Sequence, residues 1–367
     1  MAEIRGRLAH LGLLETSSDV SASDVFDDAL DGAVRHFQQQ RGANVDGAVG
    51  PQTWRLLDEA RWGLGDRVLQ HTVGHPLIGD DVAALQQRLL DMGFDAGRAD
   101  GIFGRQTDRA LRDFQRNVGL VDDGTCGPKT FKALDRLSRT VTGGAPQALR
   151  EAESIRRSGP TLVGKIIVID PGHGGSDPGQ VGGGLTEAVV AADLAARIEG
   201  RLGALGATAY LTRGRLPADR PGPDEAVRAA FANTARADLV ISLHCDGSSD
   251  PAASGVATYY YGVAGGGAHS AIGEEFAGLV QREVVARTDL LDCRTHGKTW
   301  DLLRRTRMPA VRLELGYLTH AGDAARLADA AFRDTVAEAV TVAVQRLYLP
   351  PDDDHPTGVL RLPELVG

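Results

Sequence analysis

Two segments in the first part of the chain are copies of one another. Residues 33–57 (AVRHFQQQRGANVDGAVGPQTWRLL) align without a gap with residues 110–134 (ALRDFQRNVGLVDDGTCGPKTFKAL). Self-similarity of this kind means that one structural unit occurs twice. In each copy, apolar residues recur at helical spacing, and an Asp-Gly pair followed by a Gly-Pro pair separates the FQ helix from the next one. We therefore predict two small all-α modules of three helices each, over residues 1–62 and 80–138.

The start of the chain belongs to the first copy. Residues 4–14 match residues 85–95 of the second copy. In that copy, Gly93 stands where a left-handed helix end is expected. The first copy starts only a few residues before its first matched apolar position, so we expect the native chain to extend upstream of Met1. The start as given lacks a basic segment followed by an apolar run, and no stretch approaches a bilayer-spanning length. We therefore expect a cytoplasmic protein as given, or a cell-wall protein if an upstream signal has been removed.

Charge and cysteine content exclude some functions. A net charge of -9 argues against a nucleic-acid partner, because phosphate binding needs a concentrated basic surface. The three cysteines are too few and too widely spaced for a disulfide framework or a CxxC metal site, so we expect free thiols. Cys245 beside His244 resembles a nucleophilic pair, but adjacent residues of a strand point to opposite faces.

Periodicity changes from residue 164 onward. Five β-rich runs alternate with helical stretches such as 187–203, 269–286 and 331–348. Strands that alternate with helices predict an α/β domain with a mostly parallel sheet flanked by helices. We expect this domain to cover 164–349. The predicted strands are KIIVID (165–170), ATAYLTR (207–213), DLVISLH (238–244), GVATYYYG (255–262) and AVRLELG (310–316).

Residues between and after these domains have a different composition. Residues 139–163 contain a Gly-Gly-Ala-Pro break and a Ser-Gly-Pro break, which predict a linker. Residues 350–367 begin with proline and three aspartates, and we expect a C-terminal tail outside the core.

The two repeats resemble the peptidoglycan-binding domain 1 family on the motif FQ, DG and GP.T. The resemblance implies that each module is a three-helix unit that binds peptidoglycan and accompanies a wall-lytic enzyme. The alternative is a pair of helical modules that serve as spacers or as docking sites for another protein.

Four residues of the α/β domain can carry metal chemistry. His173 follows the first predicted strand, His244 closes the third, Glu314 lies near the end of the last, and Glu187 opens a helix. In open α/β sheets the carboxyl ends of the strands border the active crevice, so these side chains can converge. Two imidazoles and a carboxylate are a suitable ligand set for a catalytic zinc, and a remaining carboxylate can act as general base.

Each of these residues also has a structural explanation. A histidine at a strand end can be a hydrogen-bonded structural residue, and a glutamate at a helix start can interact with the helix dipole. Glu314 lies inside an apolar run, where a carboxylate is costly to bury without a partner or a function, and Arg312 on the same face is the structural candidate for that partner. Asp170 and Asp177 either orient ligands or satisfy the glycine-rich turn, and we favour the turn.

The segments IDPGHGGSDPG, GLTEAVVAADLAARI, LTR, ISLHCDG and AVRLELGYLTH resemble, in this order, the amidase 3 family of N-acetylmuramoyl-L-alanine amidases. The resemblance implies one Zn²⁺ per chain bound by His173, Glu187 and His244, with Glu314 as the catalytic glutamate. It also implies hydrolysis of the amide bond between N-acetylmuramic acid and L-alanine in peptidoglycan or a muropeptide. The chain departs from the family pattern at Asp246 and His320, which puts substrate specificity in doubt rather than metal binding.

A second function comes from another class. The whole arrangement resembles actinobacterial proteins in which two binding-type repeats precede an amidase-like domain and which regulate a peptidoglycan-precursor biosynthetic enzyme by binding it. The missing export signal favours such a cytoplasmic regulator, whereas the intact ligand set favours hydrolysis.

Overall fold

The computed structural model describes residues 1–14, 25–138, 152, 153, 155, 157–214, 216, 219–262 and 269–349. The chain divides into two compact units: a first unit within Met1–Arg150, and a second formed by Glu151–Tyr261 with the residues from Ser270 onward. Most of the predicted linker 139–163 and all of the predicted tail 350–367 lie outside the described residues. No helix within the described ranges is long and apolar enough to cross a membrane.

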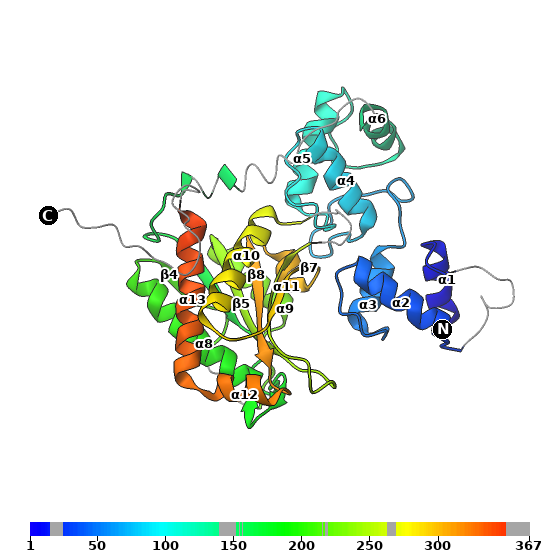
Figure 1. Ribbon diagram of the computed structural model, residues 1–367. Coiled ribbons are helices and arrows are strands. Elements are labelled where there is room, and N and C mark those ends of the chain that lie inside the picture. Colours follow the sequence, from blue (N-terminus) through cyan, green and yellow to red (C-terminus); the bar gives the residue numbers. More distant parts are fainter. Residues whose placement is uncertain are drawn as a thin grey trace. The chain divides into compact units, whose positions relative to one another are not determined.

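Each repeat contains three helices, as predicted (Figure 1). The turn at Gly93 has the predicted left-handed conformation, with φ of 88°. Leu8, Leu30, Val34 and Phe37 lie in the core of the first repeat, and Leu85, Leu89, Leu111 and Phe114 in that of the second. The helices are α1 (Ala2–His10), α2 (Asp28–Gln40) and α3 (Pro51–Glu59) in the first repeat, and α4 (Asp80–Asp91), α5 (Arg105–Asn117) and α6 (Pro128–Ser138) in the second.

A buried glutamine explains the motif that the repeats share. The side-chain nitrogen of Gln115 donates to Asp123 Oδ1 at 2.9 Å and to Thr130 Oγ1 at 3.1 Å, and its oxygen accepts from the backbone N–H of Gly124. Gln38 makes the equivalent bonds in the first repeat. Each glutamine thereby closes the loop between two helices by satisfying polar groups that would otherwise be buried without partners.

The structure contains a third copy of this glutamine arrangement, which the sequence comparison missed. Gln86 on α4 bonds Asp100, Gly101 and Thr107 in the same way, at the turn between α4 and α5. Arg5 occupies the matching position of the first repeat, where it pairs with Asp27 instead. The two repeats therefore differ in how their first two helices are joined.

The second unit is built on a six-stranded sheet of order β4-β1-β5-β8-β6-β7. All neighbouring strands are parallel except β6 and β8, which confirms the prediction of a mostly parallel sheet. The central strands are almost completely buried, because helices cover both faces. The strands are β1 (Ile166–Pro171), β4 (Thr208–Leu211), β5 (Leu239–Asp246), β6 (Val256–Tyr261), β7 (Asp292–Lys298) and β8 (Ala310–Tyr317).

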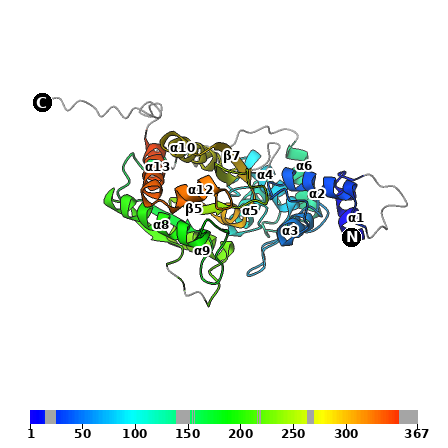
Figure 2. The same ribbon diagram turned by 60° about the horizontal axis from the view of Figure 1, so that its bottom comes forward.

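Three long helices form the layer on one face of this sheet. These are α8 (Glu187–Ala204), α10 (Ala271–Arg287) and α13 (Ala330–Tyr348), and α13 lies between the other two (Figure 2). Their apolar side chains pack against those of β1, β5 and β8 in the main core cluster. This packing fixes the start of α8, and therefore Glu187, relative to the strand ends.

Sequence patterns missed the shorter elements of this unit. The edge strand β7 reads DCRTHGK and has no apolar alternation, because an edge strand needs less apolar burial. The helix α9 (Glu225–Ala235) is rich in alanine and was not predicted, although its N-cap Asp224 followed by Glu225 was a usable start signal. The missed elements also include α11 (Asp301–Arg305), α12 (Ala321–Ala328), β2 (Val181–Gly182) and β3 (Leu185–Thr186).

Candidate metal centre and catalytic glutamate

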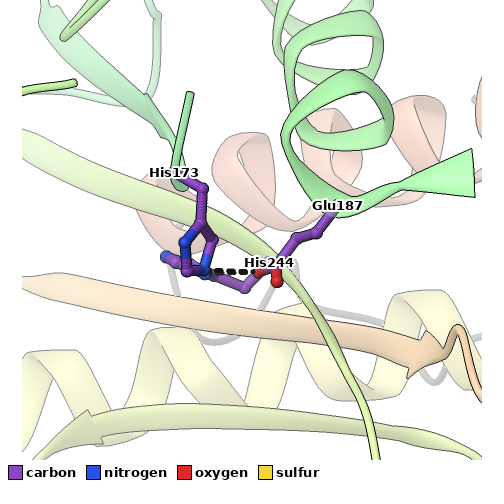
Figure 3. A group of neighbouring side chains, drawn as sticks. All are labelled: His173, Glu187 and His244. Atoms are coloured by element: carbon purple, nitrogen blue, oxygen red, sulfur yellow. Dashed lines mark hydrogen bonds and ion pairs between the residues drawn. The ribbon is translucent and has the colours of Figure 1, made fainter. Parts of the chain in front are cut away.

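His173, Glu187 and His244 come together from three different elements. His173 lies on the loop after β1, Glu187 is the first residue of α8, and His244 lies on β5 (Figure 3). One potential ligand atom from each lies within 4.8 Å of the others. The parallel pairing of β1 with β5 and the packing of α8 on both strands bring the three together.

The loop that carries His173 is held in an uncommon conformation. His173 has a φ of 56°, in the left-handed region that residues other than glycine rarely adopt. Its Nδ1 lies 2.7 Å from Asp177 Oδ2, and Asp177 Oδ1 accepts the backbone N–H of Gly179. Asp177 therefore closes the turn, as favoured, and also orients the histidine ring. Because Nδ1–H is donated to this carboxylate, Nε2 is the ring nitrogen that can bind a metal, once it has released its own proton.

Glu187 is buried and accepts hydrogen bonds from both histidines. Its Oε1 lies 2.7 Å from His244 Nδ1 and 3.2 Å from His173 Nε2, and its Oε2 accepts the backbone N–H of Gln180. Burial by itself would raise the pKa of Glu187, but the hydrogen bonds from His173 and His244 outweigh burial and hold this pKa far below its usual range. Glu187 is therefore ionised at neutral pH, as a metal ligand must be.

The two histidines differ in their protonation. Burial lowers the pKa of His244 to about 3, with the nearby Arg312 acting in the same direction, so its imidazole is neutral. Burial also disfavours charge on His173, but hydrogen bonds to Glu187 and Asp177 outweigh burial and raise the pKa of His173. A bound cation would compete with the proton on His173 for the same carboxylate.

One buried atom supports a metal at this position directly. His244 Nε2 is buried and has no hydrogen-bond partner among the described residues. An unsatisfied buried polar atom is costly unless something binds it. Imidazole nitrogens and an ionised carboxylate are the donor types that zinc prefers, so the residues present fit a zinc ion.

Glu314 lies beside this cluster on β8, paired in register with His244 on β5. Its Oε1 accepts a hydrogen bond from Arg312 at 2.7 Å, which confirms Arg312 as its partner, whereas its buried Oε2 has no partner among the described residues. Burial raises the pKa of Glu314 to about 7, although Arg312 opposes the rise. A carboxyl group with a pKa near neutrality and one unbound oxygen can accept and return a proton.

Arg312 belongs to a larger arrangement that was not predicted. Its Nη1 donates to Glu225 Oε1 on α9 at 3.0 Å, and its guanidinium lies 4.3 Å from the ring centroid of Trp300. Glu225 Oε2 accepts the backbone N–H of Leu302 in α11. These contacts hold the arginine, and through it Glu314, in one orientation.

Asp170 does not satisfy the glycine-rich turn, so that interpretation was wrong for this residue. It is the fully buried penultimate residue of β1, where it accepts hydrogen bonds from Ser242, Thr212 and Arg228. Its carboxylate links β1 to β5 through Ser242, to α9 through Arg228, and to Thr212, which directly follows β4. Sequence alone did not show this role, because the partners come from distant segments.

The remaining candidates add no ligand to this cluster. Cys245 is buried and burial raises the pKa of its thiol well above the usual value, so the residue is not an activated nucleophile. All three cysteines are free thiols, as expected. His320 caps α12 by accepting the backbone N–H of Asp323.

Known proteins match this chain in both units. The N-acetylmuramoyl-L-alanine amidase family matches residues 167–346, and the peptidoglycan binding domain family matches residues 1–57 and 78–134. The N-acetylmuramoyl-L-alanine amidase CwlM of Mycobacterium tuberculosis is 49% identical over 377 residues, which cover 100% of this chain and 92% of that protein. The N-acetylmuramoyl-L-alanine amidase LytC of Bacillus subtilis is 31% identical over 179 residues, which cover 49% of this chain and 34% of that protein.

Among solved structures, the N-acetylmuramoyl-L-alanine amidase AmiC2 of Nostoc punctiforme is 30% identical, covers 49% of this chain and 94% of its own, and has a TM-score of 0.44. The full-length similarity to the mycobacterial protein includes both the repeats and the α/β domain. This chain belongs to the N-acetylmuramoyl-L-alanine amidase family, with two peptidoglycan binding domains ahead of its amidase domain.

Proposed function

We propose that residues 164–349 form a zinc-dependent hydrolase domain that cleaves the amide bond between N-acetylmuramic acid and L-alanine in peptidoglycan or its fragments. The observation that carries this proposal is the cluster of His173, Glu187 and His244, whose ligand atoms lie within 4.8 Å of one another. Membership of the amidase family supports the choice of bond.

Three residues would hold one zinc ion: His173, Glu187 and His244. When bound there, zinc supplies Lewis-acid polarisation of the substrate carbonyl and a water of lowered pKa. Asp177 orients the ring of His173 through the bond to Nδ1, and burial keeps His244 neutral, so that both histidines are prepared as ligands.

Glu314 is the general base in this proposal. Arg312 holds its Oε1, which leaves Oε2 to accept a proton from the attacking water and to return it to the leaving L-alanine nitrogen. Because burial raises the pKa of Glu314 to about 7, both transfers are accessible near neutral pH. The products are a sugar freed of its stem peptide and a peptide with a new amino terminus.

The N-terminal modules, over residues 1–62 and 80–138, are proposed to bind peptidoglycan. Joined to the hydrolase domain by the linker 139–163, they raise the local concentration of substrate around it. The tail 350–367 has no part in this proposal.

The test combines metal content with product release. The full chain is purified without added zinc, its zinc is measured by elemental analysis, and release of stem peptide from a muropeptide is followed for wild type, His244→Ala and Glu314→Gln. About one zinc per chain with peptide release in wild type is the expected result. His244→Ala should lose both, whereas Glu314→Gln should lose release and keep zinc.

Other outcomes separate the two classes of function. Zinc without peptide release in wild type would contradict hydrolysis and favour a sensing role for the metal site. Absence of zinc from the wild-type chain would favour the cytoplasmic regulator of a precursor-synthesising enzyme. Near wild-type release by Glu314→Gln would show that another group accepts the proton.

A further inference from the structure

Arg213 lies directly behind the loop that carries His173. It follows β4, and its guanidinium is buried, with 7% of the residue exposed. Its Nε donates to the backbone carbonyl of Pro171 at 2.9 Å, and its Nη2 donates to that of Gly172 at 2.6 Å. The arginine therefore holds the last residue of β1 and the first residue of the glycine-rich loop.

The same Nη2 atom also reaches the first turn of α8. It donates to the backbone carbonyl of Ala188 at 3.1 Å. Gly172 immediately precedes His173, and Ala188 immediately follows Glu187. One nitrogen atom thus bridges the peptide groups next to two of the three proposed zinc ligands.

The contacts and burial of Arg213 indicate that its role is not to form an ion pair. All acceptors of its hydrogen bonds among the described residues are backbone carbonyls, and no described carboxylate pairs with it at ion-pair distance. Burial lowers its pKa, since a buried charge without a counter-ion is costly. Arginine has several donors in a fixed planar fork, which a smaller or more flexible cation cannot reproduce.

The loop is shaped to fit this guanidinium. A Cβ atom at Gly174, where φ is 116°, would lie 2.7 Å from Arg213 Nε, so a side chain there would collide with the arginine. His173 itself is held at a φ of 56°. A strained conformation of this kind persists only when the surrounding contacts determine it, and Arg213 supplies those contacts from one side.

We propose that Arg213 is a positioning residue for the metal centre: it fixes the separation of His173 and Glu187 by bridging the carbonyls of Gly172 and Ala188. This inference rests on the proposed zinc site and adds a residue whose hydrogen bonds go to backbone carbonyls rather than to the ligand side chains. Its replacement should weaken zinc binding in a chain that is still folded.

The experiment measures the zinc affinity of the full chain by competition with a chromogenic zinc chelator, together with the melting temperature of the metal-free protein. The variants are Arg213→Lys, which keeps the positive charge, and Arg213→Met, which removes it. Arg228→Lys is the matched control, because Arg228 is 6% exposed and donates to the side chain of Asp170 within β1 rather than to the backbone carbonyls next to His173 and Glu187.

We expect Arg213→Lys to bind zinc on the order of tenfold more weakly than wild type, as is typical when a group that orients metal ligands is lost. Arg228→Lys should lower the melting temperature by a similar amount without this loss of affinity. If Arg213→Met does not fold, the comparison of the two lysine variants decides.

An unchanged zinc affinity in Arg213→Lys would overturn this inference and leave the proposed function standing. An equal loss of affinity in Arg228→Lys would also overturn it, because the effect would then follow general destabilisation. A wild-type chain that binds no zinc would overturn the proposed function, and this inference with it.

Discussion

Replacing Glu314 by glutamine should stabilise the metal-free protein at alkaline pH while abolishing activity. The carboxyl group is buried, with 6% of the residue exposed, and burial raises its pKa from the usual 4.5 to about 7. The folded state therefore binds the proton more tightly than the unfolded state. Stability linked to this group is fully present below pH 4.5 and is lost as pH rises through 7.

The size of the effect follows from the shift in pKa. Each unit corresponds to about 1.4 kcal/mol, so a shift from 4.5 to about 7 costs about 3 kcal/mol at high pH. Most of this cost arises between pH 5 and pH 8. Glutamine remains neutral at both pH values, so Glu314→Gln should escape this loss.

The assay is urea unfolding of wild type and Glu314→Gln at pH 5 and pH 8, in the presence of a zinc chelator. The quantity compared is the change in the free energy of unfolding between the two pH values, because any constant cost of the substitution cancels. Glu338→Gln is the control, since Glu338 is exposed on α13 of the same unit. Equal pH dependence in wild type and Glu314→Gln would refute the assignment of a raised pKa to Glu314.

Three further predictions concern other parts of the chain. Gln115→Leu should lower the free energy of unfolding of the first unit by about 1 to 3 kcal/mol in urea denaturation, because buried partners of the amide lose their hydrogen bonds; the exposed Gln106→Leu should change it little, and equal effects would contradict the argument. A thiol reagent should label Cys293 in the folded protein much faster than the buried Cys245, as mass spectrometry of peptides would show, and equal rates would be inconsistent with the burial of Cys245. Limited proteolysis should cut first within 139–163, and a ladder with no preferred cut there would argue against the proposed linker.

Local patterns in the sequence were sufficient for the larger elements. The gapless repeat predicted two three-helix modules, because both copies have the same helical spacing of apolar residues and the same turn residues between helices. Runs such as KIIVID predicted buried parallel strands, because a strand covered on both faces has no polar side. The same order of strands and helices placed His173, His244 and Glu314 near strand ends.

Elements and contacts that depend on their neighbours in the fold were harder to predict from the sequence. The edge strand β7 has no alternation of apolar and polar residues to detect. The third glutamine arrangement, at Gln86, joins residues that the repeat comparison did not align with those around Gln38 and Gln115. Both are stabilised by what packs against them rather than by their own composition.

By itself, the sequence determined the two helical repeats and the α/β domain, the fold class of each, and the four residues with the chemistry of a metal site. Only the tertiary structure decided how those residues are tuned. The pKa of Glu314 near 7, the neutral state of His244 and the orientation of His173 all depend on burial and on partners such as Arg312 and Asp177. The role of Arg213 likewise depends on the tertiary structure. Its acceptors are backbone carbonyls from two separate segments, and every residue has such a carbonyl, so the sequence does not indicate which ones accept.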